Sequence, residues 1–261
     1  MLDREPVAAP TATAKLSFKL LTLNMHKGFT SFNRRFILHE LREAVRGISA
    51  DIVFLQEVIG SHDAHAARHK NWPPTPQYEF LADTIWTAHA YGRNAVYTEG
   101  HHGNAVLSKF PILRWENHDV SFGESEKRGM LHCVMKVPGP ELELHAICVH
   151  FSIFTARRRQ QFAMLCDFIG RSVPPEAPLF IAGDFNDWQL RAHRPLTRCG
   201  LKEAFVEAYG REARTWPARF PVTRLDRIYF RNARLLHPQR HAAHPWSHLS
   251  DHAPLSAEVH I

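Results

Sequence analysis

The stretch Leu179-Phe-Ile-Ala-Gly-Asp-Phe-Asn-Asp187 decides the fold class of this chain. Its first four residues are apolar and contain no turn former, which predicts a buried strand of the kind found in α/β folds. Asp184 and Asn186 follow at a spacing of two, so an extended backbone places both side chains on the same side. Sites in α/β folds lie at such strand ends. The stretch therefore offers a carboxylate and a carboxamide for chemistry, although an ordinary Asp/Asn turn would use the same residues.

Length and composition are those of a globular protein with a sizeable core. The chain has 261 residues, of which 44% are hydrophobic and 22% charged. No repeat, linker or low-complexity tract is visible, so we predict a single domain over residues 15–261. Residues 1–14 are predicted to form a disordered leader. The net charge of +6 suits a polyanionic partner such as nucleic acid or an anionic lipid surface, but many soluble proteins are mildly basic.

The cysteines and the N-terminal residues favour a cytoplasmic protein. Cys133, Cys148, Cys166 and Cys199 form no CxxC pair, and their use suits a reducing compartment. The first residues lack the apolar core of a signal peptide, and no run approaches the roughly 18 apolar residues of a membrane span. We therefore expect no transmembrane segment, and nothing in the sequence points to an obligate protein partner.

The apolar runs predict a strand-rich α/β protein. About ten to twelve short strands and a few helices are too strand-rich for one doubly wound sheet. Two sheets packed face to face with helices outside fit better. A basic amphipathic helix is expected from Thr155 to Arg171, and its Arg157–Arg159 run could contact a phosphate backbone or form a solvated face.

Polar residues capable of phosphoester chemistry stand at the ends of the predicted strands. Taken singly, each is a common turn or surface residue. Together they form a set of oxygen, amide and imidazole groups: Asn24, Glu57, His150, Asp184, Asn186, Asp226, Asp251 and His252. Such a set suits phosphoester hydrolysis with a Mg²⁺-like ion, because hard cations prefer oxygen ligands and polarise phosphoryl oxygens.

The carboxylates can bind the metal ion and activate the water, and the amides can bind the phosphoryl group. Glu57 and Asp251 are hard ligands for a Mg²⁺-like ion. Asp184 can orient or deprotonate the attacking water, and Asn186 and Asn24 can hold phosphoryl oxygens.

The imidazoles supply positive charge and protons. His252, held by Asp226 in a carboxylate–imidazole pair, can stabilise the charge that develops during the reaction. His150 offers a second imidazole for phosphate binding or acid catalysis.

Seven segments in order resemble the motif series of the endonuclease/exonuclease/phosphatase (DNase I-like) superfamily, in a bacterial intracellular form. They start at Leu23, Leu55, Gly103, Val149, Gly183, Leu225 and Ser250 and read LNMHKG, LQEV, GNAVLSKFP, VH, GDFN, LDRIYF and SDH. The resemblance implies a four-layer α/β/β/α sandwich of two packed mixed β-sheets flanked by helices. It also implies a catalytic Mg²⁺ or Mn²⁺ and hydrolysis of a phosphoester by in-line attack of water.

The resemblance assigns the candidate residues the roles given above and adds three details. Asn24 joins the two carboxylates as a metal ligand. His150 matches the histidine that flanks the scissile phosphate in the nuclease branch, and Glu99 is our guess for its usual carboxylate partner. Arg128 resembles a substrate-contacting arginine of some members.

The substrate is the least determined part of the prediction, because the fold does not choose among phosphoesters. We predict a metal-dependent phosphodiesterase, most simply nuclease-like. A phospholipid-directed phosphodiesterase and a small-molecule phosphatase are the alternatives, although no long apolar hairpin for membrane docking is visible. A non-catalytic nucleic-acid-binding protein is less favoured because the acidic and amide set is intact.

Overall fold

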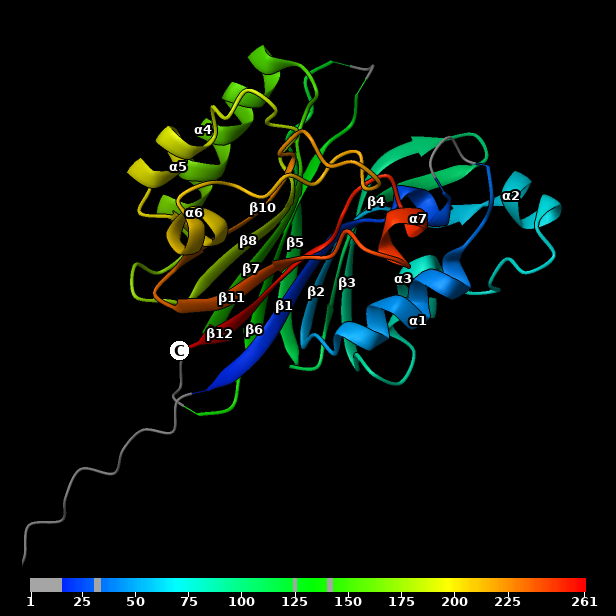
Figure 1. Ribbon diagram of the computed structural model, residues 1–261, viewed down its shortest axis with the longest axis horizontal. Coiled ribbons are helices and arrows are strands. Elements are labelled where there is room, and N and C mark those ends of the chain that lie inside the picture. The colour runs from blue at the N-terminus through cyan, green and yellow to red at the C-terminus, as the bar shows by residue number, and fades with distance from the viewer. Residues whose placement is uncertain (1–15, 31–33, 124–125, 140–142) are drawn as a thin grey trace, which may run out of the picture.

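Two six-stranded mixed β-sheets pack face to face, with helices on their outer faces (Figure 1). This computed structural model describes residues 16–30, 34–123, 126–139 and 143–261, and the leader predicted at residues 1–14 lies outside these ranges. The predicted α/β/β/α sandwich is thereby confirmed.

The first four strands and the last two form one sheet, and the six strands between them form the other. The first sheet contains β1 (Ser17–Asn24), β2 (Ile52–His62), β3 (Ala88–Tyr97), β4 (Gly100–Ser108), β11 (Arg234–Arg240) and β12 (Leu255–His260), in the order β11-β12-β1-β2-β4-β3. The second contains β5 (Ile112–Asp119), β6 (Gly129–Lys136), β7 (Glu143–His150), β8 (Leu179–Asp184), β9 (Lys202–Glu203) and β10 (Asp226–Arg231), in the order β5-β6-β7-β8-β10-β9.

One parallel pair at the centre of each sheet needs a crossover helix. β1 and β2 run parallel across α1 (Leu38–Ile48), and β7 and β8 run parallel across α4 (Thr155–Ser172). The remaining helices are η1 (His26–Gly28), α2 (Asp63–Arg68), α3 (Gln77–Ala82), α5 (His193–Arg198), α6 (Ala204–Tyr209) and α7 (Trp246–Leu249). Within the described ranges, no helix is long and apolar enough to cross a membrane.

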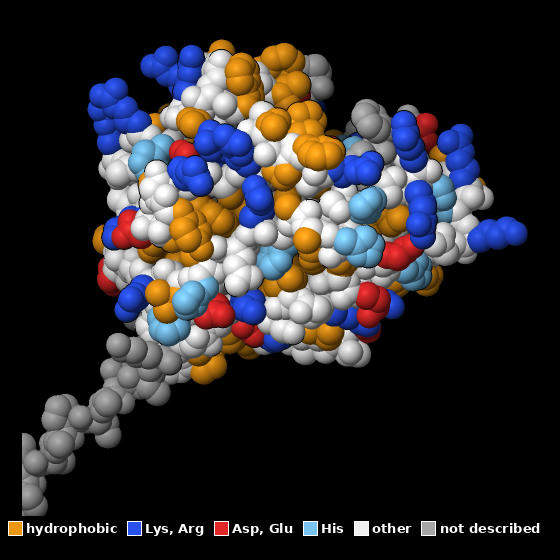
Figure 2. Space-filling model, in the orientation of Figure 1, with side chains coloured by type: hydrophobic (Ala, Val, Ile, Leu, Met, Phe, Trp, Pro, Cys, Tyr) orange, Lys and Arg blue, Asp and Glu red, His pale blue; other side chains and the backbone are white. Residues whose placement is uncertain are grey.

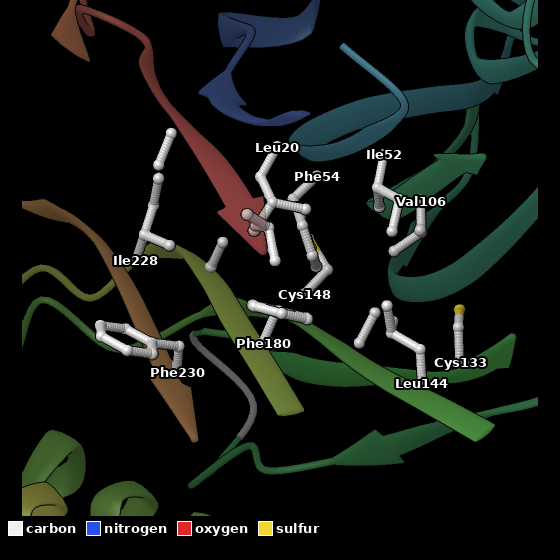
Figure 3. Close-up of a cluster of buried hydrophobic side chains, with 14 of the residues drawn as sticks. Leu20, Ile52, Phe54, Val106, Cys133, Leu144, Cys148, Phe180, Ile228 and Phe230 are labelled. Atoms are coloured by element: carbon white, nitrogen blue, oxygen red, sulfur yellow. The ribbon is translucent and has the colours of Figure 1, made fainter. Parts of the chain in front are cut away.

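Alternation along the central strands buries both faces of each sheet. Leu20 and Phe54 point into the layer between the sheets, where they meet Phe180 and Ile228 of the second sheet (Figure 3). The intervening residues of β1 and β2 point outward under α1, α3 and α7, and those of β7 and β8 point outward under α4 and α5. Such two-sided burial is what continuous apolar strands require.

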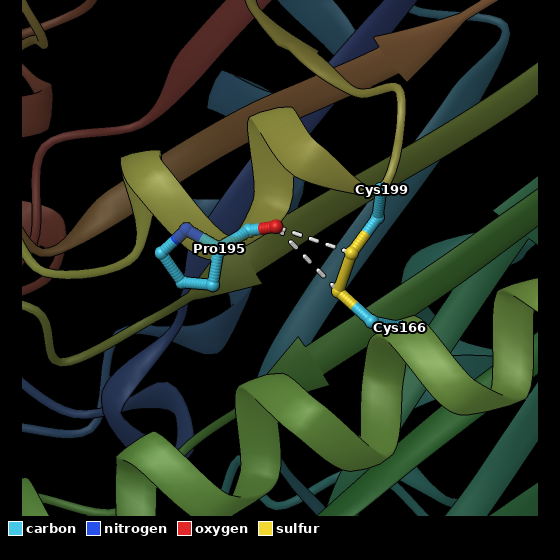
Figure 4. The surroundings of a disulfide bond; sticks show 3 residues. All are labelled: Cys166, Pro195 and Cys199. Carbon is cyan, nitrogen blue, oxygen red and sulfur yellow. Dashed lines mark hydrogen bonds between the residues drawn. A yellow bond between two sulfur atoms is a disulfide. The ribbon is translucent and has the colours of Figure 1, made fainter.

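Cys166 and Cys199 form a disulfide, which the spacing of the cysteines did not predict and which weighs against the expected reducing compartment. The bond joins α4 to the residue that follows α5, and both sulfurs face the carbonyl oxygen of Pro195 (Figure 4). The pair was missed because the two cysteines are 33 positions apart in the sequence, and only the packing of α5 against α4 brings them together. Cys133 and Cys148 are buried and free.

We expect the double variant Cys166→Ser/Cys199→Ser to unfold more easily than the oxidised protein. Closing a loop of this length reduces the freedom of the unfolded chain, so the loss should be about 2–4 kcal/mol in free energy of unfolding. Urea denaturation measures it. A reductant should lower the stability of the wild type to that of the variant and leave the variant unchanged. Equal stability of the oxidised protein and the variant would contradict a stabilising disulfide.

Candidate active site

The strand register brings the predicted residues to one edge of the sandwich. In the parallel pair of the first sheet, Asn24 lies opposite Gln56, one residue before Glu57. In the second sheet, Asp184 lies opposite His150 on one side and Asp226 on the other. Because parallel strands end at the same edge, side chains far apart in sequence meet there.

Asp184 lies at the centre of this group and is buried. One carboxylate oxygen, Oδ1, accepts the backbone N–H of Asn186 at 2.8 Å, and Oδ2 accepts from Asn24 Nδ2 at 3.2 Å. The imidazole Nε2 atoms of His150 and His252 lie 3.6 Å and 3.9 Å from Oδ2. Burial raises the pKa of Asp184 to about 6, although the charge of His252 and both hydrogen bonds oppose the rise. A carboxylate with this pKa is ionised at neutral pH and can accept a proton.

His252 and Asp226 form the predicted carboxylate–imidazole pair. His252 Nδ1 lies 2.9 Å from Asp226 Oδ2, and both side chains are buried. Burial alone would lower the pKa of His252, but the charges of Asp226 and Asp184 outweigh it and raise the pKa to about 10. The imidazole is therefore a cation at neutral pH, held between two carboxylates.

The His252 pair should make stability fall as the pH rises above neutrality. Its pKa in the folded protein lies above the ordinary value of 6.5, so the folded protein binds the proton more tightly. The stabilisation is fully present below pH 6.5 and is lost as the pH rises towards 10, with a slope of up to about 1.4 kcal/mol per pH unit. Asp226→Asn should flatten this slope, as urea denaturation between pH 6 and 10 would measure. An unchanged slope would contradict the pairing.

Glu57, Asn24 and Asp251 lie on the side of the site that belongs to the first sheet. A register shift between Leu55 and Val58 marks a β-bulge, and Glu57 within it has φ 56°. Glu57 Oε1 accepts from Asn24 Nδ2 at 3.3 Å. The bulge and this hydrogen bond direct the carboxylate towards the centre of the site.

Asp251 is paired with His26, which the sequence analysis did not single out. Their Oδ1 and Nδ1 atoms are 3.2 Å apart, and Trp216 Nε1 donates to Asp251 Oδ2 at 3.4 Å. Burial would raise the pKa of Asp251, but the His26 hydrogen bond and the nearby imidazole charges hold it at about 2. The hydrogen bond to Asp251 and the charge of Glu57 raise the pKa of His26. The only advance signal for His26 was its position two residues after Asn24, just beyond the end of β1.

Two groups of side chains could attract a metal ion, and their chemistry differs. Ligand atoms of Asp184, Asp226 and His252 lie within 4.8 Å of one another. Here the protonated imidazole already supplies a cation and its Nδ1 is bonded to Asp226, so this group is not a free ligand set. Glu57, Asp251 and the Asn24 side-chain oxygen are hard oxygen donors, which fit Mg²⁺ or Mn²⁺.

The backbone carbonyl of Phe151 connects three of the remaining candidates. It accepts from Arg128 Nε at 3.1 Å and from Asn186 Nδ2 at 3.0 Å, one residue after His150. Burial and the charge of Arg128 lower the pKa of His150 well below 6.5, so its imidazole is neutral. Arg128 also pairs with Glu126 at 2.9 Å. Part of the hydrogen-bonding capacity of Arg128 and Asn186 therefore fixes the loop after β7.

The carboxylate nearest to His150 was guessed wrongly. Glu99 is exposed in the turn between β3 and β4, whereas Asp184 lies 3.6 Å from the His150 ring.

Asn104 is a further residue beside the site that was not predicted. It is fully buried in β4, and its side-chain amide donates to the carbonyls of Gly129 and Cys148. It ties the two sheets together beside the site.

Comparison with known proteins identifies the family of this chain. Residues 21–252 match the Endonuclease/Exonuclease/phosphatase family, a span that contains every candidate site residue. The chain belongs to this family. Members of the endonuclease/exonuclease/phosphatase family are phosphoester hydrolases that generally use divalent metals.

A relative with high sequence identity covers almost the whole chain. YbhP of Escherichia coli (strain K12) is 55% identical over 253 residues, which is 97% of this chain and 100% of the relative. The similarity therefore spans nearly all of this chain and all of the relative.

Solved structures of the endonuclease/exonuclease/phosphatase family share the fold at low sequence identity. The family protein from Beutenbergia cavernae has a TM-score of 0.72 at 15% identity and covers 94% of this chain and 72% of that one. D. rerio TDP2 complexed with single strand DNA product has a TM-score of 0.68 at 17% identity, with 93% and 98% covered. At these identities the likeness extends to the fold.

Proposed function

We propose that this protein is a divalent-metal-dependent phosphodiesterase that hydrolyses its substrate by in-line attack of an activated water. The observation that carries the proposal is the buried Asp184 carboxylate. It is held by Asn24 and by the Asn186 backbone, and its pKa is about 6. A general base is most effective when its pKa lies near the working pH.

The chain's own groups then act around Asp184. Asp184 orients the water and accepts its proton. The His252 imidazolium, fixed by Asp226, stabilises negative charge that develops on the phosphoryl oxygens. The neutral His150 and the second amide hydrogen of Asn186 bind the phosphoryl group, since Asn186 Nδ2 carries two hydrogens and donates one of them to the Phe151 carbonyl.

Arg128 completes the substrate-binding group in this proposal. Its positive charge lowers the pKa of His150, and its guanidinium is anchored beside the site by the Phe151 carbonyl and the Glu126 carboxylate. An anchored guanidinium is a suitable partner for a phosphate oxygen because little side-chain freedom is lost on binding.

The proposed metal ligands are Glu57, Asp251 and Asn24. The low pKa of Asp251 supports this role, because a metal ligand must be deprotonated at neutral pH. A bound Mg²⁺ or Mn²⁺ would polarise the phosphoryl group and stabilise the leaving oxygen.

A nuclease-like substrate is the first proposal for the diester. The net charge of +6 favours a polyanion, and the fold is shared with TDP2, one structure of which holds a single strand DNA product. Cleavage within a strand and cleavage from an end are both compatible with this site.

Exposed apolar side chains around the site favour a phospholipid as the second candidate substrate. Ile153 and Phe154 lie in the loop after β7, and Trp188 lies two residues after Asn186. Phe220 is 79% exposed in a loop whose Ala218 N–H donates to the Asp251 carbonyl. In Figure 2 orange side chains gather along the upper edge of the molecule. Exposed apolar groups at the mouth of a site are typical of proteins that act at a membrane surface. This feature was not predictable from the sequence, because separate loops contribute its side chains.

A hydrolysis panel tests the proposed function. Single-stranded DNA, plasmid DNA, RNA, phospholipid vesicles and bis-p-nitrophenyl phosphate are each incubated with Mg²⁺, with Mn²⁺ and with EDTA. We expect metal-dependent cleavage of bis-p-nitrophenyl phosphate and of one natural class. Failure on every diester by metal-loaded protein would overturn the proposal.

The cytoplasmic location predicted from the sequence remains a prediction. The Cys166–Cys199 disulfide weighs against it, because structural disulfides persist mainly in oxidising compartments.

A further inference from the structure

An arginine-lined cavity of about 670 Å³ lies between α4 and α5, and none of the candidate active-site residues lines it. Its cationic lining consists of Arg158, Arg159, Arg191, Arg194 and Arg198. In Figure 2 blue side chains gather at the upper left, where Figure 1 places α4 and α5.

Only one of these arginines is neutralised in the described part of the chain. Arg158 is buried, lies 3.8 Å from the Asp187 carboxylate and donates to the carbonyls of Ser152 and Ile153. The other four are exposed, and their guanidinium groups form no salt bridge with any residue that the structure describes. The cavity is therefore strongly positive.

The spacing of the unpaired arginines makes this concentration of charge unfavourable without a ligand. Arg194 and Arg198 are four residues apart on α5, where side chains at this spacing are neighbours on one helix face and like charges repel. Arg191 lies just before α5 and lines the same cavity. A bound anion would remove the repulsion.

The mixed charged and apolar lining of the cavity suits a phosphate group attached to a less polar body. Phe162 is buried on the α4 side, and Leu190 and Pro195 add apolar surface. Guanidinium groups bind phosphate oxygens through paired N–H donors, and several around one cavity favour a multiply charged phosphate. The Cys166–Cys199 disulfide joins the two helices at one end, so their separation is fixed before a ligand arrives (Figure 4).

The cavity is connected to the active site through one side chain. Asp187 follows Asn186, and its carboxylate accepts the backbone N–H groups of Arg191 at 2.9 Å and Ala192 at 2.7 Å. The same carboxylate faces Arg158. The loop that begins in the active site thus forms one wall of the cavity.

We propose that the cavity between α4 and α5 is a second anion site, which binds a multiply charged phosphate group outside the catalytic centre. That group could belong to a free phosphate ester or to a phospholipid head group, because the arginines recognise the phosphate in either case. Occupancy does not depend on catalysis or on a metal ion.

Calorimetric titration of inorganic pyrophosphate into the EDTA-treated full chain tests the site. We expect binding of one pyrophosphate per chain that weakens with salt. Arg194→Glu/Arg198→Glu should weaken it at least tenfold. The control Arg68→Glu/Arg171→Glu makes the same charge change at exposed positions outside the cavity, so it should bind nearly as tightly as the wild type. Equal affinities of both variants, or no binding by the wild type, would overturn the proposal.

Three further measurements secure the interpretation. The cavity variant should unfold at no lower temperature than the wild type, because its glutamates stand among the remaining arginines of the cavity. Its metal-dependent hydrolysis of bis-p-nitrophenyl phosphate should be unchanged, so a failure of the proposed enzyme would not be confused with a failure of this site. Flotation with phosphatidylcholine vesicles, with and without phosphatidic acid, identifies the source of the phosphate. Recruitment by phosphatidic acid that the cavity variant loses supports a head group, and pyrophosphate binding without recruitment supports a free phosphate ester.

Discussion

Replacing Asp184 by Asn should reduce phosphodiester hydrolysis at least about a hundredfold, the scale of losing a general base. Asn keeps the shape of the side chain but cannot accept the proton of the attacking water. For the wild type, kcat/KM should fall as the pH drops below about 6, because Asp184 becomes protonated there. Initial rates with bis-p-nitrophenyl phosphate between pH 5 and 9 measure both effects.

The same substitution should not destabilise the protein at neutral pH. The pKa of Asp184 is higher in the folded protein than its ordinary value of 3.8, so folding favours the protonated form and stability falls as the pH rises from about 4 to 6. A neutral Asn avoids the cost of a buried ionised carboxylate.

Asp167→Asn, on the exposed face of α4, is the control for the activity measurement and should keep full activity. Activity of Asp184→Asn within about tenfold of the wild type would contradict the role of Asp184.

Removal of divalent metal should abolish activity, with a loss of at least about a hundredfold, because charge stabilisation by the ion is worth several kcal/mol. EDTA-treated protein should regain activity with Mg²⁺ or Mn²⁺. Glu57→Gln should require a higher metal concentration for half-maximal rate, since an amide is a weaker ligand than a carboxylate. Rates measured against metal concentration give this midpoint, and calorimetric metal titration gives the affinity directly.

Glu99→Gln is the matched control for the metal experiment. It makes the same chemical change at an exposed turn, outside the candidate site, so its metal requirement should equal that of the wild type. Activity that survives exhaustive chelation would contradict a metal-dependent mechanism. An unchanged midpoint in Glu57→Gln would contradict the ligand assignment alone.

The layers of the fold were predictable because the central strands carry continuous apolar runs. Leu179–Ala182 must be buried on both faces, and the structure places Phe180 between the sheets and Ile181 under the helices. The apolar runs predicted buried strands, and the family resemblance predicted that these strands form a four-layer sandwich. The α4–α5 disulfide was not predictable, because it depends on how two helices pack on one sheet.

The polar residues at strand ends were predictable individually, but their contacts were not. The register that places Asp226 and His150 on either side of Asp184 follows from the order β7-β8-β10, which no local pattern specifies. The same holds for the pairing of His26 with Asp251, which joins residues from opposite ends of the chain. Residue type indicated the chemistry, whereas topology determined the neighbours.

The stereochemical course of hydrolysis tests the central claim most directly. A phosphorothioate diester that is chiral at phosphorus would be cleaved in ¹⁸O-labelled water with Mg²⁺. A single in-line attack by water predicts inversion at phosphorus, with the labelled oxygen on the phosphorus-containing product. Retention of configuration, or label in the alcohol product, would contradict direct attack by a water activated at Asp184.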